Sequence, residues 1–410
     1  IFSTMQTKLA AFVSDIPAGR EAQEILGRCV HCGFCTATCP TYQLLGNELD
    51  GPRGRIYLIK SMLEGTACSK STLLHLDRCL TCRSCETTCP SGVEYGRLLE
   101  IGRQVAEKAV PRPIGHRLGR RLLVWFLTSS LFPVLVGLGR SVRNLFPENV
   151  ARYIPMRYAA GEIPTTSRSR QMIVLEGCAQ PALSPNINAA AARVLDQLGI
   201  SLISAPEVGC CGALPLHLSI EDRARQTMRR NIDAWWPLLE SGAECIVMTA
   251  SGCGVTVKEY GLVLADDSKY AEKARRVSSV TRDLTEILLR EPMSASLAGR
   301  GMKVAVQTPC TLQHGQGING SIEEILSRLG FEQATVENSH LCCGSAGSYS
   351  ILQSAIANRL RKNKLTALQA DGPSVIATAN VGCQVHLAAQ ATVPVRHWIE
   401  LVDSAMQLND

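Results

Sequence analysis

The sequence contains few aromatic residues and little net charge, and these two shortages narrow its possible partners. Phe, Trp and Tyr together make up 5% of the 410 residues, and the formal net charge is +6. A nucleic-acid-binding domain typically shows a strongly basic surface or a recognisable motif, and the sequence contains neither a zinc-finger pattern nor an RNA-binding aromatic motif. We therefore expect no nucleic-acid partner.

The sequence also lacks the motifs of a self-contained catalyst. No glycine-rich dinucleotide fingerprint follows a predicted strand, because Gly137-Leu138-Gly139 lies inside an apolar stretch. No Ser-His-Asp order and no pair of carboxylates stands out. We therefore predict no catalytic residue and no nucleotide-binding residue in this chain.

Cysteine, by contrast, is abundant, with 18 residues. The N-terminus does not resemble a secretory signal, and disulfides are rare inside cells, so we expect these cysteines to serve metal clusters. The chain is long enough for two or three domains, and its 46% of apolar residues can supply their cores.

Two cysteine runs near the start have the spacing of [4Fe–4S] sites. Residues 29–40 and 79–90 each follow the pattern C-x2-C-x2-C-x3-C-P. In bacterial-type ferredoxins the fourth cysteine of each run ligates the other cluster, and a single C-x2-C pair would suit zinc equally well. Two complete runs favour iron–sulfur clusters. The predicted ligands are Cys29, Cys32, Cys35 and Cys89 for cluster 1, and Cys79, Cys82, Cys85 and Cys39 for cluster 2.

The segment between the two runs is predicted to be helical. Apolar residues recur at helical spacing over residues 56–63, after a turn at Gly51-Pro52. This pattern predicts an α-helical ferredoxin domain over residues 1–110. Arg53 and Arg55 either offset the negative charge of a thiolate-ligated cluster or simply occupy a helix N-terminus.

Residues 111–170 form a basic and apolar linker. Ten arginines occur here against only two glutamates, Glu148 and Glu162. Within it, residues 122–139 carry no charge, would extend about 27 Å as a helix and are interrupted by Pro133. Three interpretations remain open for this stretch: a short membrane span, a segment lying in the membrane interface, or a contact with a partner subunit.

From residue 171 predicted strands and helices alternate, and the same order occurs twice, in residues 171–300 and 301–410. Alternation of this kind predicts two α/β domains with mainly parallel sheets, whose cysteines follow the carboxyl ends of strands. The repeats keep their cysteines in register, at offsets of 132, 132 and 130, which indicates an internal duplication. The cysteines concerned are Cys178, Cys210, Cys211 and Cys253, and then Cys310, Cys342, Cys343 and Cys383.

These eight cysteines are candidates for a further centre. Four thiolates at loop tips suit either an iron–sulfur centre or zinc, adjacent thiols also suit a redox-active pair, and a metal-free core is the remaining alternative. His340 and His386 lie near the cysteines of the second repeat and are weaker candidates. Cys68 and Cys245 fall outside both patterns, and the apolar strand around Cys245 indicates a core thiol.

This order of elements resembles the iron–sulfur subunits of membrane-associated flavin dehydrogenases. The group includes heterodisulfide reductase-type proteins, the small subunit of anaerobic glycerol-3-phosphate dehydrogenase, lactate-utilisation proteins and, most similar, glycolate oxidase iron–sulfur subunits. Heterodisulfide reductase-type members often end a repeat with C-x2-C, whereas Cys253 and Cys383 each stand alone. We therefore expect a four-thiolate or incomplete centre rather than a five-thiolate one. The similar stretches are RCVHCGFCTATCPTYQLL, DGPRGRIYLIK, LEGCAQPALSP, NIDAWWP, SHLCCGSAGSY and RHWIEL.

The resemblance implies an electron-transfer subunit of a complex that oxidises glycolate to glyoxylate. FAD and substrate would then be held by flavin-containing partner subunits, and electrons would pass through two [4Fe–4S] clusters to quinone or another acceptor. The alternatives are a subunit of a lactate or glycerol-3-phosphate dehydrogenase, and a heterodisulfide reductase-like catalyst of thiol and disulfide chemistry. The expected location is the cytoplasm or, through peripheral membrane contact, the cytoplasmic face of the inner membrane.

Overall fold

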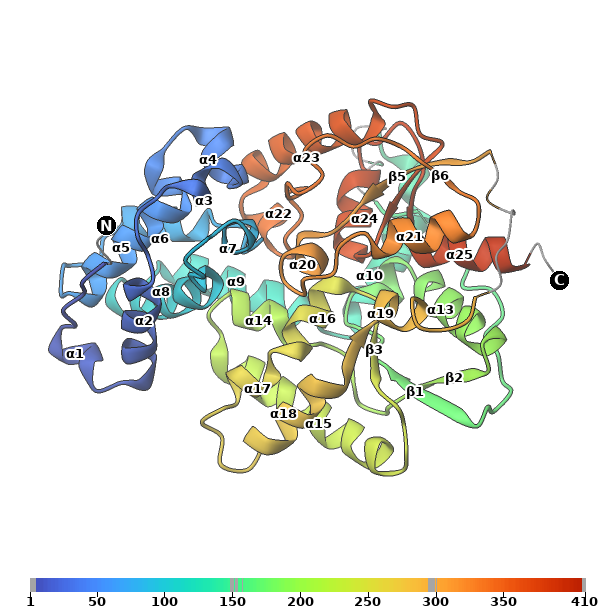
Figure 1. Ribbon diagram of the computed structural model, residues 1–410, viewed down its shortest axis with the longest axis horizontal. Coiled ribbons are helices and arrows are strands. Elements are labelled where there is room, and N and C mark those ends of the chain that lie inside the picture. Colours follow the sequence, from blue (N-terminus) through green and yellow to red (C-terminus); the bar gives the residue numbers. More distant parts are fainter. Residues whose placement is uncertain are drawn as a thin grey trace. The chain divides into compact units, whose positions relative to one another are not determined.

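The computed structural model describes residues 5–147, 151, 154–156, 158–293, 299 and 301–407. The chain divides into two compact units. Figure 1 shows the ribbon coloured along the sequence, with its helices and strands labelled. Unit 1 comprises residues 1–119 and 340–364, and unit 2 comprises residues 120–339 and 365–410. Arg152 and Arg157 of the basic linker lie outside the described residues. The division into four segments expected from the sequence remains a prediction.

Unit 1 consists of short helices around one apolar core, as the sequence predicted. Prolines begin α2, α4 and α5, where the missing N–H leaves no helical bond unmade. Leu26, Ile59 and Leu98 are fully buried in the core. The helices are α1 (Ala11–Ser14), α2 (Pro17–Gly27), α3 (Phe34–Ala37), α4 (Pro40–Leu45), η1 (Glu48–Asp50), α5 (Pro52–Leu63), α6 (Lys70–Asp77), α7 (Ser84–Thr87), α8 (Tyr95–Ala109) and α22 (Tyr349–Leu352). Helices α9 (Ile114–Leu127) and α23 (Ser354–Gln369) begin in unit 1 and end in unit 2.

A segment from the second cysteine-rich repeat belongs to unit 1. The Tyr349 hydroxyl donates to the carbonyl of Arg78 at 3.0 Å, and Arg359 donates to the carbonyl of Leu44 at 3.2 Å. Residues 340–364 therefore pack with the ferredoxin-type helices, although more than 250 residues separate them in the chain. The sequence pattern predicts this segment as part of the second repeat alone, because contacts with the N-terminal helices leave no local signal.

Unit 2 contains two four-stranded sheets in which every pairing is parallel. Their strand orders, β2-β1-β3-β4 and β6-β5-β7-β8, are equivalent, which confirms the predicted duplication. The outer strands β4 and β8 were not predicted, because each has three residues and a polar end that no hydrophobic pattern marks. The strands are β1 (Arg170–Val174), β2 (Ile200–Ser204), β3 (Ile246–Met248), β4 (Thr281–Asp283), β5 (Lys303–Gln307), β6 (Glu332–Gln333), β7 (Val375–Thr378) and β8 (Val395–His397).

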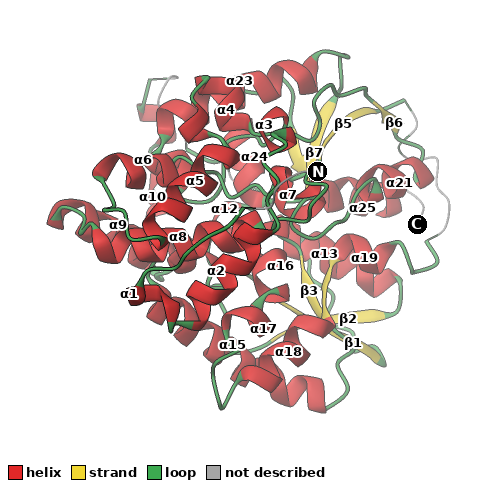
Figure 2. Ribbon diagram, turned by 60° about the vertical axis from the view of Figure 1, so that its left-hand side comes forward, coloured by secondary structure: helices red, strands yellow, loops and turns green. Residues whose placement is uncertain are grey.

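The two repeats share one apolar core. Buried residues of α13 and α25, such as Leu195 and Trp398, belong to the same cluster, and Figure 2 shows these two helices between the sheets. An ion pair between Arg193 and Asp403 joins the same helices at 2.7 Å. The helices of unit 2 are α10 (Leu131–Ser141), η2 (Arg143–Leu145), α12 (Gln180–Leu183), α13 (Asn186–Gln197), α14 (Ala213–His217), α15 (Glu221–Glu240), α16 (Ser251–Lys258), α17 (Tyr260–Val263), α18 (Ala271–Val280), α19 (Leu284–Leu288), α20 (Cys310–Gln313), α21 (Ser321–Arg328), α24 (Val381–Ala388) and α25 (Trp398–Gln407).

The uncharged stretch 122–139 does not form one helix. Helices α9 and α10 meet at an angle of 81°. The helical conformation is interrupted at residues 128–130, shortly before Pro133. Within the described residues, no single helix is sufficiently long and apolar to cross a membrane, and only this bent pair passes that test jointly.

Candidate iron–sulfur sites

The two ferredoxin-type loops have the same backbone conformation. His31 and Thr81, each two residues after the first cysteine of its run, both have φ +57°. Gly33 and Arg83, four residues after it, have φ +82° and +59°, and each precedes a one-turn helix. Left-handed backbone is unfavourable for residues other than glycine, and such strain concentrates at functional sites. Alternating left-handed residues curl each loop tightly around its cysteines.

The first loop encloses a cavity together with the last cysteine of the second run. Cys29, Cys32, Cys35 and Cys89 line this cavity, and Cys85 of the second loop also forms part of its lining. The remaining lining is mostly apolar, with Arg53 at one side. Four sulfur donors in an apolar cavity are the ligand set that a [4Fe–4S] cluster requires.

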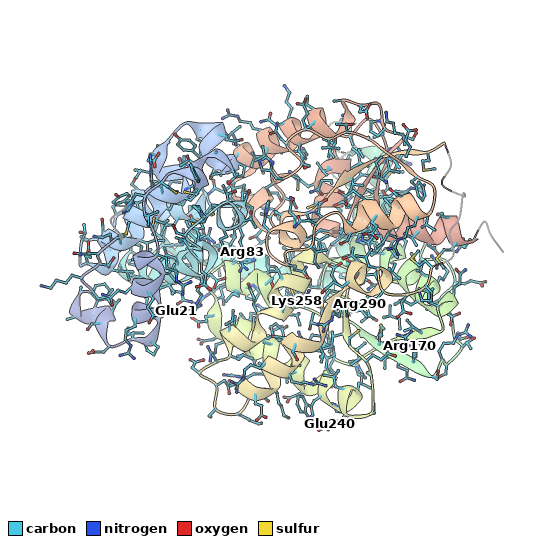
Figure 3. The ribbon with its side chains drawn as sticks, viewed as in Figure 1. Glu21, Arg83, Arg170, Glu240, Lys258 and Arg290 are labelled. Atoms are coloured by element: carbon cyan, nitrogen blue, oxygen red, sulfur yellow. The ribbon has the colours of Figure 1, made fainter. Side chains whose placement is uncertain are left out.

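The second loop encloses the corresponding cavity. Cys79, Cys82 and Cys85 line it together with Cys39, the last cysteine of the first run. Arg83, labelled in Figure 3, also lines this cavity. The cysteines are thus grouped in the crossed arrangement expected from the ferredoxin spacing, although their assignment as ligands stays a prediction. The two cavities share three lining residues: Pro52, Cys85 and Tyr95.

Burial raises the pKa of three thiols in these cavities, those of Cys29, Cys35 and Cys85. Burial and the neighbouring Cys29 raise the pKa of Cys35 to about 12, and burial raises the pKa of Cys85 well above its ordinary value. Binding of a cluster must therefore displace protons from buried sulfur. In the described part of the chain, no three His, Cys, Asp or Glu side chains are arranged to hold a single metal ion. A four-iron cluster is larger than one ion and takes thiolates that lie farther apart.

A buried ionic network borders the second cavity. Asp50 accepts from Arg78 at 2.9 Å and lies 2.9 Å from His75 Nδ1, while Arg55 Nη2 lies 3.8 Å from the same carboxylate. Arg55 is 1% exposed and donates to the carbonyl of His75. Arg53 is instead partly exposed and pairs with Glu48. The sequence left open whether Arg53 and Arg55 offset cluster charge. Both line a cavity, but only Arg55 is fully buried there.

Sequence reasoning missed the polar groups that contact the cysteine sulfurs. The Tyr95 hydroxyl donates to Cys79 Sγ at 3.7 Å, and Thr41 Oγ1 lies 3.3 Å from Cys39 Sγ. The only signal in the sequence was that both residues lie close to a cysteine run. Thr41 lies two residues after Cys39, and Tyr95 lies six residues after Cys89.

The first cysteine-rich repeat brings its four thiols together at the carboxyl ends of its strands. Cys178 contacts Cys210, Cys210 contacts Cys211, and Cys211 contacts Cys253 through their side chains. The pKa of Cys210 is lowered because Cys178 and Cys211 donate hydrogen bonds to its sulfur, as does the Gly212 N–H at 3.3 Å. The pKa values of Cys178 and Cys211 are raised in return. This donor set fits a sulfur-ligated centre.

Buried polar side chains hold the Cys210-Cys211 turn in place. Asn231 donates to the carbonyl of Cys210 at 2.8 Å, and Tyr260 donates to the carbonyl of Cys211 at 2.7 Å. Trp235 stacks on Tyr260 with ring centroids 6.3 Å apart. Residues of the NIDAWWP stretch therefore support the cysteine pair from α15.

The cysteines of the second repeat are described in two separate groups. Cys342 and Cys343 are buried in unit 1, whereas Cys310 and Cys383 are buried in unit 2. Gly344 has φ +90°, the same as Gly212 at the equivalent position of the first repeat. A Cβ at Gly344 would lie 2.7 Å from the carbonyl oxygen of Ala357, so this turn requires glycine.

The remaining candidates have structural surroundings. Cys245 is buried in the shared core, as predicted, and Cys68 is partly buried just before α6. His386 is buried within α24. Burial lowers the pKa of His340, and nearby Lys364 lowers it further.

A helical domain with two four-cysteine cavities, joined to a duplicated cysteine-rich α/β domain, defines an iron–sulfur protein of the two-cluster type. Residues 25–93 match the family model described as 4Fe-4S dicluster domain, and residues 172–258 and 304–388 match the one described as Cysteine-rich domain. The "Glycolate oxidase iron-sulfur subunit" of Escherichia coli K12 is 53% identical over 406 residues, covering 98% of this chain and 100% of that protein. The chain therefore belongs to the family of glycolate oxidase iron–sulfur subunits.

More distant relatives share the same architecture in whole or in part. The "Probable glycolate oxidase iron-sulfur subunit" of Bacillus subtilis 168 is 27% identical over 398 residues, covering 88% of this chain and 87% of that protein. "Lactate utilization protein A" of the same organism is 23% identical over 237 residues, covering 55% of this chain and 96% of that protein.

Proposed function

We propose that this chain is the electron-transfer subunit of a glycolate-oxidising complex, in which FAD and glycolate are bound by flavin-containing partner subunits and quinone or another acceptor receives the electrons. The observation that carries the proposal is the grouping of eight cysteines around two adjacent cavities. The 53% identity to the Escherichia coli subunit supports glycolate as the substrate of the complex. No dinucleotide fingerprint was found in the sequence, which agrees with a flavin held elsewhere.

The proposed ligands are Cys29, Cys32, Cys35 and Cys89 for one [4Fe–4S] cluster, and Cys79, Cys82, Cys85 and Cys39 for the other. A bound cluster of this kind supplies a one-electron redox centre. This chain contributes the thiols, the apolar walls that exclude water, and the buried Arg55 near the second set. The shared lining residues keep the two sets adjacent, which favours transfer between them.

The ligand assignment is tested with single cysteine variants of the anaerobically purified complex. The wild-type chain should carry about eight iron and eight sulfide in its two cubanes. Cys89→Ala and Cys39→Ala should each reduce that content by about four iron. Both variants should abolish glycolate-dependent dye reduction while the flavin remains reducible. Cys68→Ala is the matched control and should change neither value.

Two results would contradict this proposal. The first is stoichiometric zinc in place of iron and sulfide. The second is full iron content in both variants, because the crossed arrangement predicts one damaged cluster in each. Glycolate, lactate and glycerol 3-phosphate should be compared as substrates of the same complex, since relatives named for lactate utilization share part of this architecture.

We also propose a further sulfur-ligated centre in the cysteine-rich repeats, with heterodisulfide reductase-like thiol chemistry as the second candidate function. The contact among Cys178, Cys210, Cys211 and Cys253 supports both, because clustered sulfurs suit an iron–sulfur centre or disulfide exchange. Metal above the content of two cubanes that is lost in Cys211→Ser supports a centre. Turnover of a disulfide by the purified complex, also lost in Cys211→Ser, supports thiol chemistry instead.

Peripheral attachment to the cytoplasmic face of the inner membrane is proposed for the helix pair α9 and α10. Residues 108–147 include seven Lys or Arg residues, counting Lys108, and no Asp or Glu. Apolar side chains on this pair are exposed: Leu122, Trp125, Leu131, Val134, Leu135 and Leu138. Exposed apolar residues in a stretch rich in Lys and Arg suit an interface rich in anionic lipid.

Vesicle binding tests the membrane proposal. The complex should sediment with vesicles containing anionic phosphatidylglycerol and less with neutral phosphatidylcholine, and Leu135→Glu should abolish the difference. Leu262→Glu is a matched control, because Leu262 is also an exposed leucine, on α17. Loss of the flavin subunits from purified Leu135→Glu complex would show that this surface contacts a partner instead.

A further inference from the structure

Polar groups contact the sulfurs of the second cavity in a way that the first cavity does not reproduce. We infer that Tyr95 and Arg55 raise the reduction potential of the cluster held by Cys39, Cys79, Cys82 and Cys85, so that the two clusters of this subunit are electronically unequal. The inference rests on the proposed [4Fe–4S] clusters and concerns residues of this chain that are not ligands.

Tyr95 is placed to donate a hydrogen bond to a ligand sulfur. It is the first residue of α8, is 4% exposed and directs its hydroxyl to Cys79 Sγ at 3.7 Å. The same sulfur accepts from the Thr81 N–H at 3.5 Å.

Arg55 adds positive charge within the protein interior. Its Nη1 and Nη2 donate to Thr41 Oγ1 at 3.3 and 3.2 Å, and Thr41 Oγ1 lies 3.3 Å from Cys39 Sγ. The surrounding network contains two guanidinium groups, of Arg55 and Arg78, against the single carboxylate of Asp50. This network beside the second cavity therefore has a net positive charge, and its member in the cavity lining, Arg55, is 1% exposed, so water screens its charge poorly.

Tyr95 also lines the first cavity, but its hydroxyl donates to Cys79 of the second set, and the described lining of the first cavity contains no arginine as deeply buried as Arg55. Its arginine, Arg53, is 38% exposed and is neutralised by Glu48 at 2.6 Å. Tyr95 follows the last cysteine of its run by six residues, and the equivalent position after the first run is Leu45, which has no hydroxyl. The duplicated loops are thus alike in backbone and different in the groups around them.

Both features favour the reduced state of the second cluster. Reduction adds one negative charge to an already anionic cluster, so a hydrogen bond to sulfur and a nearby buried cation stabilise the reduced form more than the oxidised form. The result is a higher potential, which makes this cluster the preferred location of an electron that enters the subunit.

The test is a redox titration of the intact complex, followed by electron paramagnetic resonance. Tyr95→Phe removes the hydroxyl and keeps the ring. It should lower the midpoint of one cluster and leave the other unchanged, changing the ratio of reduced to oxidised form by about threefold to tenfold. A tenfold change corresponds to 59 mV for a one-electron couple. Tyr57→Phe is the matched control, because Tyr57 is 47% exposed and stacks on His31 beside the first loop.

The outcomes separate this inference from the proposed function. Full iron content in Tyr95→Phe with both midpoints unchanged would overturn the inference and leave the clusters in place. Absence of iron–sulfur clusters from the wild-type complex would overturn the proposed function itself. If Tyr95→Phe loses its clusters, the inference is tested with Thr41→Val, which removes the hydroxyl between Arg55 and Cys39. This variant should also lower the midpoint of one cluster only, and two unchanged midpoints would overturn the inference.

Discussion

Protonation of one buried histidine should limit the stability of unit 2 in mild acid. His397 is fully buried at the end of β8, and its Nε2 donates to the carbonyl of Thr249 at 2.9 Å. Its Nδ1 accepts from the Ile399 N–H at 3.4 Å. Burial lowers the pKa of His397 to about 3, although the carbonyls of Thr249 and Ala379 act in the opposite direction. The neutral imidazole therefore bridges the first repeat and the second.

The expected loss of stability follows from the difference between the folded and unfolded pKa values. In the unfolded chain the imidazole titrates at its ordinary value of about 6.5, so protonation below that pH favours the unfolded state. The effect is almost absent at pH 7.5. At pH 5 it amounts to about 2 kcal/mol, and it continues to grow until the pH approaches the folded value.

Urea unfolding followed by tryptophan fluorescence measures this effect. All four tryptophans, at positions 125, 235, 236 and 398, belong to unit 2, so the signal reports that unit. His397→Gln cannot be protonated and should lose about 2 kcal/mol less stability than the wild type between pH 7.5 and pH 5. His116→Gln, at an exposed position, is the control. Equal pH dependence in wild type and His397→Gln would refute the reasoning.

Three further predictions concern other buried groups. Burial raises the pKa of Asp283 to about 6, so its ionised form is costly above that pH; Asp283→Asn should raise the urea midpoint at pH 8 but not at pH 4, and a lower midpoint at pH 8 would contradict this. Gly344→Ala should lower the thermal midpoint, measured by circular dichroism, by the equivalent of about 1–3 kcal/mol, because its Cβ would meet the carbonyl of Ala357. The control Gly347→Ala also has positive φ but an open position, so equal losses in both variants would exclude the steric cause. Cys245→Ala should cost about 1 kcal/mol of core packing and leave the iron content unchanged, whereas a loss of iron would make Cys245 a ligand.

The sequence by itself predicted the cysteine loops and the α/β repeats, because each of these features depends on residues close together in the chain. Cysteine spacing predicted the two loops because a three-cysteine loop is built from seven consecutive residues, 29–35 in the first run and 79–85 in the second. The alternation of apolar strands and helices predicted the duplicated α/β domain because each element has its own periodicity. The register of the Cys-Cys-Gly motifs then identified the duplication, which the equivalent strand orders of the two sheets confirm.

Only the tertiary structure decided which distant residues meet. The packing of residues 340–364 into unit 1, the contact of Tyr95 with Cys79, and the network of Asp50, Arg55 and His75 join positions that no periodic pattern relates. Buried polar groups must form hydrogen bonds with other groups of the protein. Which groups are available as partners depends on how all the helices and strands pack together. The sequence therefore determined what kind of cluster the chain is built to hold, and the fold determined the groups that distinguish one cluster from the other.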